Sequence, residues 1–259
     1  MTSVNEFNAE PSEELSFFLG AWLGDGWGDD ADGGKRLLLK VRSLDFANEF
    51  ADSATAILNK RESYFARSIV DENGQWYQVK VTSILLYELA NRPFGQLSGY
   101  IKPHPTGFLR AFFTAEGNPA VSVNRSRDSP TLELTVCVSN TELEYVQYAM
   151  GLLIGLGYHP TRMTRGGRPG VERTIGKYSF TTTKTEWQFR IARMAEIDTF
   201  LNRIGFADSA KQEKTETAQS LIREYGRHRA SVAWTKMYEK TGRKWQKKST
   251  VNNSPIGAG

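Results

Sequence analysis

The spacing of apolar and polar residues changes along the chain, and the same series of spacings occurs twice. Apolar residues three to four apart predict a helix, and strict alternation predicts a half-exposed strand. The first series predicts a helix capped by Ser12 and running to Asp25, a hairpin over Trp27–Arg42, a helix over Asp45–Leu58, a hairpin over Tyr64–Thr82 and a helix over Ser83–Ala90. The second predicts a helix ending at Glu116, strands over Ala120–Ser126 and Thr131–Ser139, a helix over Thr141–Leu156, strands near Tyr158–Arg165 and Tyr178–Thr183, and a helix over Thr185–Ile204. Both halves therefore have the order helix, two strands, helix, two strands, helix.

The first helix of each half has a small residue at every fourth position and ends in an acidic residue followed by glycine. The two segments are Phe18–Gly26 and Phe108–Gly117, and the small residues are Gly20, Gly24, Ala111 and Ala115. Small residues four apart lie on one helix face and let two backbones approach closely. If the two helices pack side by side, Asp25 and Glu116 lie at the same end.

Two adjacent carboxylates repel each other unless a divalent cation holds them, so this spacing predicts a metal-dependent catalytic centre. A single segment of this kind is most often a core helix. A pair of membrane helices is excluded because no apolar run approaches the roughly 18 residues that a span needs. A nucleotide-binding loop at Gly24–Gly28 is also excluded, since no strand precedes it and Asp25 would repel a phosphate.

The two segments resemble the signature motifs of LAGLIDADG homing endonucleases, in the single-chain form with two motifs. The resemblance extends over roughly residues 12–222, and the acidic motif position is filled in both copies. The second copy departs from the pattern at Arg110 and Thr114. The resemblance implies an α+β fold of two pseudo-symmetric αββαββα halves that pack through the motif helices and form a DNA-binding saddle of antiparallel sheets. The implied parts are an N-terminal half (1–92), a linker (93–103), a C-terminal half (104–222) and a basic tail (223–259).

The implied activity is site-specific cleavage of both strands of a long DNA target by metal-dependent phosphodiester hydrolysis. Asp25 and Glu116, with the preceding Gly24 and Ala115, would form the metal site for Mg²⁺, which Mn²⁺ or Ca²⁺ can also occupy. Members of the family position water with a lysine after the last helix of each half. The matching positions here are Lys211 and Lys102. Ser43 and Asn140 are further candidates for the same water network.

Charge is distributed unevenly along the chain. The net charge is +4, but residues 223–248 contain nine basic and two acidic residues, which leaves −3 for the rest. The predicted strands are basic and the predicted helices acidic, which favours a sheet that faces phosphates. The candidate DNA contacts are Lys35, Arg36, Lys40, Arg42, Arg67, Lys80, Arg125, Arg127, Arg162, Arg165, Arg173 and Lys177. The tail, helical over Ala218–Tyr238, is expected to bind the phosphate backbone.

The remaining features concern location and alternative functions. Cys137 is the single cysteine, which favours a reducing compartment: the cytoplasm, or a mitochondrion or chloroplast. The polar N-terminus does not resemble a secretory signal. The three histidines show no zinc-site spacing. We expect a monomeric, intron-encoded enzyme whose partner is double-stranded DNA. The alternatives are an intron maturase that binds RNA with the same fold, and a DNA-binding regulator that has lost the nuclease.

Overall fold

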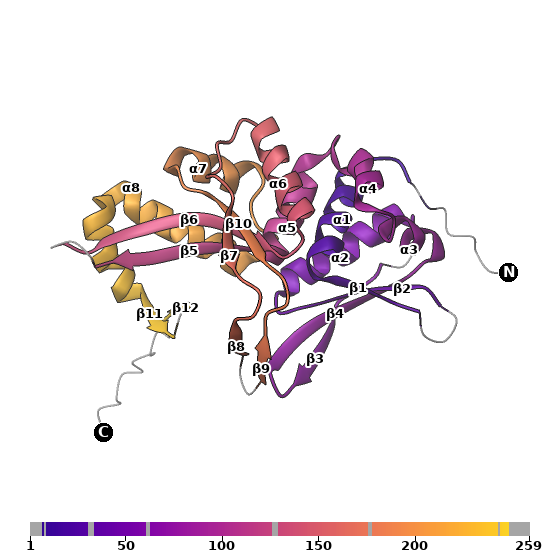
Figure 1. The fold of residues 1–259 in the computed structure, drawn as a ribbon, viewed down its shortest axis with the longest axis horizontal. Coiled ribbons are helices and arrows are strands. Elements are labelled where there is room, and N and C mark those ends of the chain that lie inside the picture. The colour runs from indigo at the N-terminus through magenta and orange to yellow at the C-terminus, as the bar shows by residue number, and fades with distance from the viewer. Residues whose placement is uncertain are drawn as a thin grey trace, which may run out of the picture. The chain divides into compact units, whose positions relative to one another are not determined.

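A computed structural model of the protein describes residues 7, 9–30, 34–60, 63–125, 129–175, 178–242 and 244–248 (Figure 1). Helix α1 (Glu13–Asp25) begins at Ser12, whose Oγ accepts a hydrogen bond from Leu15 N at 3.1 Å. Two glutamates in its first turn complement the helix dipole. Most of α1 is buried, because its sequence is apolar on nearly every side.

The first half forms a four-stranded antiparallel sheet in the order β1-β2-β4-β3. Its elements after α1 are β1 (Gly26–Asp29), β2 (Arg36–Val41), α2 (Leu44–Ile57), β3 (Arg67–Asp71), β4 (Gly74–Thr82) and α3 (Ile84–Ala90). The turn from β3 to β4 uses Gly74 at a φ of 112°, where a residue without Cβ is favoured. The apolar face of this sheet packs under α2, while the opposite face stays polar.

The second half repeats the arrangement, with a sheet in the order β5-β6-β10-β7. Its elements are α5 (Pro105–Glu116), β5 (Gly117–Asn124), β6 (Thr131–Asn140), α6 (Leu143–Gly155), β7 (Thr164–Gly167), β10 (Glu186–Ile191) and α7 (Met194–Arg203). A separate hairpin, β8 (Glu172–Ile175) with β9 (Tyr178–Thr181), connects β7 to β10. The α+β fold of two αββαββα halves, packed through their first helices, is therefore confirmed.

The second half differs from the expected elements between residues 158 and 204. The segment predicted as one helix over Thr185–Ile204 is strand β10 followed by α7. In β10 the buried Phe189 and Ile191 alternate with the exposed Arg190, a period of two that we misread as the start of the following helix. The strand expected near Tyr158–Arg165 lies later, as the short β7. The strand expected at Tyr178–Thr183 is present as β9, but it pairs with β8 in a separate hairpin and not in the four-stranded sheet.

The segments expected to be irregular or tail-like also contain regular structure. Residues 93–103, the expected linker, contain helix α4 (Phe94–Ile101). The helix near the C-terminus, α8 (Ser209–Met237), begins earlier than Ala218 and is kinked at Gly226, where φ is 70°. It leads into a hairpin of β11 (Tyr238–Thr241) and β12 (Lys244–Lys247).

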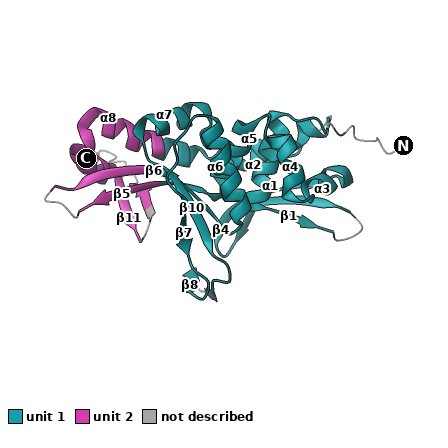
Figure 2. Cartoon of the chain, turned by 45° about the horizontal axis from the view of Figure 1, so that its top comes forward, with its two compact units in different colours: residues 1–119, 135–214 teal, residues 120–134, 215–259 magenta. Residues whose placement is uncertain are grey.

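Contacts divide the chain into two compact units (Figure 2). Unit 1 comprises residues 1–119 and 135–214, and it contains both motif helices. Unit 2 comprises residues 120–134 and 215–259. Within unit 2, Trp234 stacks on Tyr238 with ring centroids 3.8 Å apart, and His228 Nδ1 donates to the carbonyl oxygen of Pro130 at 2.9 Å. The division at residues 92, 103 and 222 that the resemblance implies stays a prediction.

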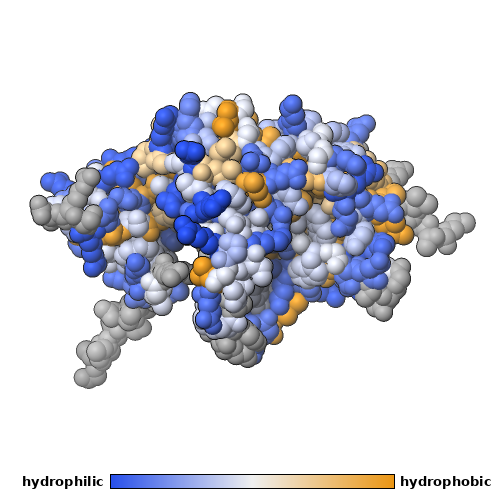
Figure 3. All heavy atoms as spheres, viewed as in Figure 1, coloured by the Kyte–Doolittle hydropathy of each residue, from blue (hydrophilic) through white to orange (hydrophobic). Residues whose placement is uncertain are grey.

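The surface of the described residues is largely hydrophilic on the face drawn in Figure 3, with hydrophobic residues scattered among the polar ones. Within the described ranges, no helix is both long and apolar enough to cross a membrane.

Candidate active site

Helices α1 and α5 pack closely against each other, and glycine permits this contact. A Cβ atom at Gly20 would lie 2.6 Å from the carbonyl oxygen of Phe108 and 3.0 Å from Ala111 Cβ. A Cβ atom at Gly24 would lie 2.4 Å from Ala115 Cβ. Real Cβ atoms do not approach other atoms this closely, so the small residues set the distance between the two helices. The small-residue pattern in the two motif segments therefore corresponds to the contact between them.

The two motif acids lie at corresponding ends of this helix pair. Asp25 is the last residue of α1 and Glu116 is the last residue of α5. A carboxylate at a helix C-terminus is unfavourable, because the helix dipole already places negative charge there. A Cβ atom added at Gly24 would lie 3.5 Å from Glu116 Cγ. Because Gly24 directly precedes Asp25, the two acidic helix ends are adjacent. Helix stability does not explain two acids at this place.

The electrostatics of the pair agree with mutual repulsion. Loss of surrounding water raises the pKa of the Asp25 carboxyl, although part of its side chain stays exposed. Burial, the charge of Asp25 and, more weakly, the charge of Glu186 raise the pKa of Glu116 to about 8. Without a cation the pair therefore retains a proton near neutral pH.

Lys211 is the cation that offsets this repulsion. Its Nζ donates hydrogen bonds to the carbonyl oxygens of Thr114 at 2.5 Å and Gly117 at 2.8 Å, on either side of Glu116. Its charge acts to lower the pKa of both Asp25 and Glu116. The structure therefore places this predicted lysine, from the first turn of α8, beside the acid pair.

The structure does not bring Lys102 to the acids. Lys102 follows the end of α4 and precedes α5, whereas Glu116 is the last residue of α5. With a rise of about 1.5 Å per residue, the two ends of α5 lie roughly 16 Å apart. Lys102 instead lines a groove of about 630 Å³ that is bordered by Phe94 and Tyr148. Lys102 was chosen because it precedes the second motif in the sequence. Its place before α5 puts it near the start of that helix, whereas the acid lies at the end.

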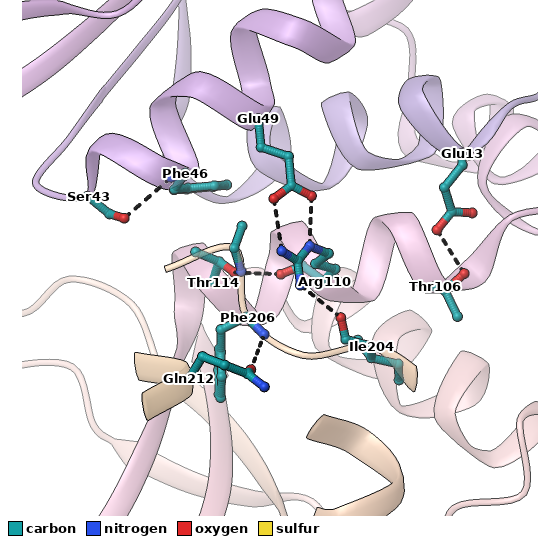
Figure 4. Close-up of polar contacts among 11 residues, drawn as sticks. Glu13, Ser43, Phe46, Glu49, Thr106, Arg110, Thr114, Ile204, Phe206 and Gln212 are labelled. Atoms are coloured by element: carbon teal, nitrogen blue, oxygen red, sulfur yellow. Dashed lines mark hydrogen bonds and ion pairs between the residues drawn. The ribbon is translucent and has the colours of Figure 1, made fainter. Parts of the chain in front are cut away.

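The two further candidates for the water network differ in position. Asn140 donates a side-chain hydrogen bond to Glu116, which favours the ionised carboxylate. Its Oδ1 accepts from Glu142 N at 2.7 Å, so the amide group is oriented with its NH₂ toward Glu116. Ser43 instead caps α2, and its Oγ accepts from Phe46 N at 3.3 Å (Figure 4).

A cavity of about 560 Å³ opens beside Glu116 and was not anticipated from the sequence. Hydroxyl and charged side chains line it: Ser139, Thr141, Arg168, Thr181, Thr182, Thr183, Lys184 and Glu186, with Asn140 and Glu116. Glu186 opens strand β10, so the incorrect helix assignment for that segment hid it. Lys184 is paired with Glu142. The cavity leaves the Glu116 carboxylate accessible from the side of the second sheet.

The residues at the helix ends fit a divalent cation. Two repelling carboxylates supply hard, anionic oxygen ligands of the kind that Mg²⁺, Mn²⁺ and Ca²⁺ take. Among the described residues no group of three or more His, Cys, Asp and Glu could hold a metal, and the candidate centre has two acids, Asp25 and Glu116. Gly24 and Ala115 directly precede them at the tightest point of the helix contact. Their role as ligands stays a prediction.

The exposed face of the first sheet carries several of the predicted DNA contacts. Lys40, Gln78 and Arg67 lie opposite one another on three neighbouring strands. Lys40 is paired with Asp71 at 3.0 Å, and Arg42 lies over the ring of Trp76 at 4.6 Å. The other predicted cations with described side chains, Lys35, Arg36, Lys80, Arg125, Arg162 and Arg165, are exposed or half-buried.

Three of the predicted DNA contacts lie in the outer hairpin or outside the described residues. Arg173 lies in the β8–β9 hairpin, outside the four-stranded sheets. Arg127 and Lys177 lie outside the described residues. Sequence reasoning also missed Arg190, an exposed cation of β10 opposite Cys137, because its segment was read as a helix.

Two αββαββα halves joined through paired helices with acidic ends have the fold of the LAGLIDADG homing endonucleases, which confirms the expected resemblance. Among solved structures the chain is similar to I-DmoI in complex with DNA and Ca, with a TM-score of 0.50, 13% identity, and coverage of 74% of this chain and 88% of that one. It is also similar to a structure of mesophilic variants of the homing endonuclease I-DmoI, with a TM-score of 0.50, 14% identity, and coverage of 74% of this chain and 88% of that one. For an I-DmoI variant in complex with its target DNA and Mg, the TM-score is 0.50 and the identity 13%, with coverage of 76% of this chain and 98% of that one. No protein-family model matches the chain, and no curated protein does.

Proposed function

We propose that the protein is a homing endonuclease, a site-specific enzyme that hydrolyses one phosphodiester bond in each strand of a long DNA target. The observation that carries the proposal is the meeting of Asp25 and Glu116 at the ends of two closely packed helices, beside Lys211. The similarity to structures described as complexes of I-DmoI with DNA, Ca and Mg supports the same activity. Because one chain supplies both acids, a monomer is sufficient. An intron-encoded origin and a reducing compartment belong to the same proposal.

Each residue of the centre has a definite part in this reaction. Asp25 and Glu116 would hold Mg²⁺ in their ionised forms, and the hydrogen bond from Asn140 favours the ionised form of Glu116. When bound, the ion stabilises charge on the scissile phosphate and leaving oxygen and lowers the pKa of the attacking water. The ammonium of Lys211 orients that water. The water oxygen forms the new bond to phosphorus, the bond to the 3′ oxygen breaks, and a proton passes to that oxygen.

The exposed faces of the two sheets are the proposed DNA-binding saddle. Lys40, Gln78 and Arg67 have donor groups that reach base edges or phosphates from one continuous face. The half-buried ring of Trp76 lies under both Lys40 and Arg42 and holds these cations close to the sheet.

The decisive experiment is incubation of the protein with its own intron-less insertion-site DNA and Mg²⁺. A double-strand break at one position establishes the function. Binding of the site without cleavage, at any Mg²⁺ or Mn²⁺ concentration, would identify a regulator instead. Binding to intron RNA with no effect on the DNA would identify a maturase.

The raised pKa of Glu116 predicts how stability depends on pH. A carboxyl with a pKa of 4.5 in the unfolded chain and about 8 in the folded one binds its proton more tightly when folded. The free energy of unfolding of the metal-free protein should therefore fall as the pH rises between these values. Addition of Ca²⁺ at pH 8 should restore stability, by about 2.7 kcal/mol at a hundred times its Kd.

Urea unfolding in EDTA and in Ca²⁺, at pH 5 and pH 8, measures both effects. Glu116→Gln should remove both, while Glu88→Gln, a substitution of an exposed acid on α3, should keep both. Equal behaviour of the parent and Glu116→Gln would argue against a metal site at the helix ends.

The basic part of unit 2 is proposed to add affinity without sequence preference. Arg227, Arg229, Lys236 and Lys240 are exposed on α8 and β11. Replacing all four by Gln should weaken binding to every DNA and reduce the slope of log K against log salt by up to about 3.6. Deletion of the tail is a poorer test, because it also removes the buried Trp234 and Tyr238.

Substitution of sheet residues should have the contrasting effect. Lys40→Ala or Arg67→Ala should relax the preference at particular base pairs, at about 1–3 kcal/mol for each bidentate contact. Selection from a randomised target library measures this preference. If the quadruple variant changes the preferred bases and the sheet variants do not, the sheet is not the reading surface.

A further inference from the structure

Arg110 connects the two halves of unit 1 through one side chain (Figure 4). Its Nε and Nη2 donate to the two carboxylate oxygens of Glu49 on α2, at 2.7 and 3.0 Å. Its Nη1 donates to the carbonyl oxygen of Ile204, directly after α7, at 3.2 Å. A guanidinium is suited to this arrangement because its planar fork holds a carboxylate with two bonds and still has a donor available. Arg110 therefore fixes the end of α7 relative to α2.

Thr114 continues the same connection one helical turn further along α5. Its Oγ1 donates to the carbonyl oxygen of Arg110 at 2.7 Å and accepts from Ala207 N at 2.8 Å. Ala207 is buried, so this hydroxyl satisfies a backbone donor that water does not reach. The backbone carbonyl oxygen of Thr114 accepts from Lys211 Nζ. One residue thus holds both the start of the segment that leads into α8 and the lysine in its first turn.

The segment between α7 and α8, residues 204–208, is shaped to receive these contacts. Gly205 has a φ of 65°, and a Cβ there would lie 3.1 Å from both Arg110 Nη1 and Gln212 Oε1. Gln212 Oε1 accepts from Phe206 N at 3.0 Å, which closes the turn onto α8. The position of Lys211 is therefore determined by contacts that originate on α5.

Stability alone gives only part of the reason for Arg110. Its side chain and that of Glu49 are each 35% exposed, so water screens their attraction, although the two-bond geometry strengthens the pair. The contact between α1 and α5 is already set by the glycines. Arg110 and Thr114 lie four residues apart, on one face of α5, and both hold the segment between α7 and α8, through Ile204 and Ala207. The shared target of the two side chains indicates a shared task.

We propose that Arg110 and Thr114 are positioning residues for Lys211, holding the 204–208 segment so that the ammonium stays beside Glu116 and Asp25. The role of Lys211 in cleavage rests on the proposed function. The restraint on Lys211 does not, so the two are tested separately.

Thr114→Val and Thr114→Ser form a matched pair for the test. Valine has the shape of threonine without the hydroxyl, while serine keeps the hydroxyl, and both keep the carbonyl oxygen that contacts Lys211. Acetylation by acetic anhydride, followed by mass spectrometry, measures the accessibility of the Lys211 amine without DNA or metal. We expect acetylation of Lys211 to be about tenfold faster in Thr114→Val and unchanged in Thr114→Ser, because the segment opens locally.

Single-turnover cleavage in Mg²⁺ measures the consequence for the reaction. Thr114→Val should lower the rate by about tenfold to a hundredfold, with DNA affinity in Ca²⁺ unchanged, because a small displacement of a positioned group costs this much. Thr114→Ser should cleave like the parent. If Lys211 is acetylated faster in Thr114→Val than in the parent, but the parent itself never cleaves DNA, then the restraint on Lys211 is supported and the proposed function is refuted.

Arg110 variants provide a second test if Thr114→Val does not fold. Arg110→Met should release Lys211 in the same way, and Arg110→Lys should do so in part, because lysine cannot hold both Glu49 and Ile204. Arg193→Met is the control, since it removes the ion pair of Arg193 with Glu196 on α7 without contacting the 204–208 segment. Unchanged acetylation of Lys211 in folded Arg110→Met would overturn the proposal. Faster acetylation with parental cleavage would support the restraint and overturn the role of Lys211 in cleavage.

Discussion

Asp25→Asn and Glu116→Gln should each lower the single-turnover rate of double-strand cleavage by at least about 10³-fold, because each removes a charged ligand of the ion that stabilises the transition state. DNA affinity in Ca²⁺ should stay within about tenfold, since neither acid is a phosphate contact. Rapid-quench cleavage of a labelled target, with electrophoretic separation of nicked and broken products, measures the rate of each strand.

The same substitutions carry their own control for folding. Each removes one of two carboxylates that repel each other, so both variants should be at least as stable as the parent in EDTA. Loss of cleavage in a protein of equal or higher Tm then reflects chemistry. Glu88→Gln, which changes an exposed acid on α3, should cleave normally. Parental cleavage in either motif variant would remove the acid from the active site.

Gly20→Ala and Gly24→Ala should each destabilise the protein strongly, although each adds only one methyl group. The added Cβ would lie 2.6 Å from the carbonyl oxygen of Phe108 or 2.4 Å from Ala115 Cβ, so the two helices must separate. We expect the free energy of unfolding to fall by about 1–3 kcal/mol or more. Separation also moves Asp25 away from Glu116, so cleavage should fall even under conditions in which the variant is folded.

Gly151→Ala is the matched control for this prediction. Gly151 lies in helix α6, is exposed, and has no atom within 4 Å of an added Cβ. There the same substitution should raise stability by about 0.5–1 kcal/mol, because alanine restricts the unfolded chain. Urea unfolding of the three variants compares them directly. If Gly20→Ala and Gly151→Ala shift the midpoint alike, the helix contact is not as close as described.

The parts of the fold that local patterns determine were predictable from the sequence. Ser12 and the acidic first turn placed the start of α1, and the Asn73-Gly74 pair placed the turn between β3 and β4. The spacing of small residues indicated which helices pack together, because that contact repeats a simple four-residue pattern.

Other parts depend on information that no local pattern contains. Pro93 and nearby glycines suggested a linker, yet proline is tolerated at a helix start and the buried Leu97 and Ile101 hold α4 in place. Lys211 was the better sequence match and Lys102 the weaker one, but only the structure shows that the two lysines lie near opposite ends of α5. The contacts of Arg110 with Glu49 and Ile204 span 61 and 94 residues, and the sequence around Arg110 contains no pattern that predicts them.

The surroundings of the two motif acids are unequal. Asn140, Glu186 and Lys211 all come from the second half of the chain, and all act on Glu116. In a symmetric homodimer the two acids would have identical environments, and a DNA target would be read as a palindrome. Once both copies share one polypeptide, each half can change alone. Under the proposed function, such a chain can follow a target that changes in one half-site, and its two halves can contribute unequally to the two cuts.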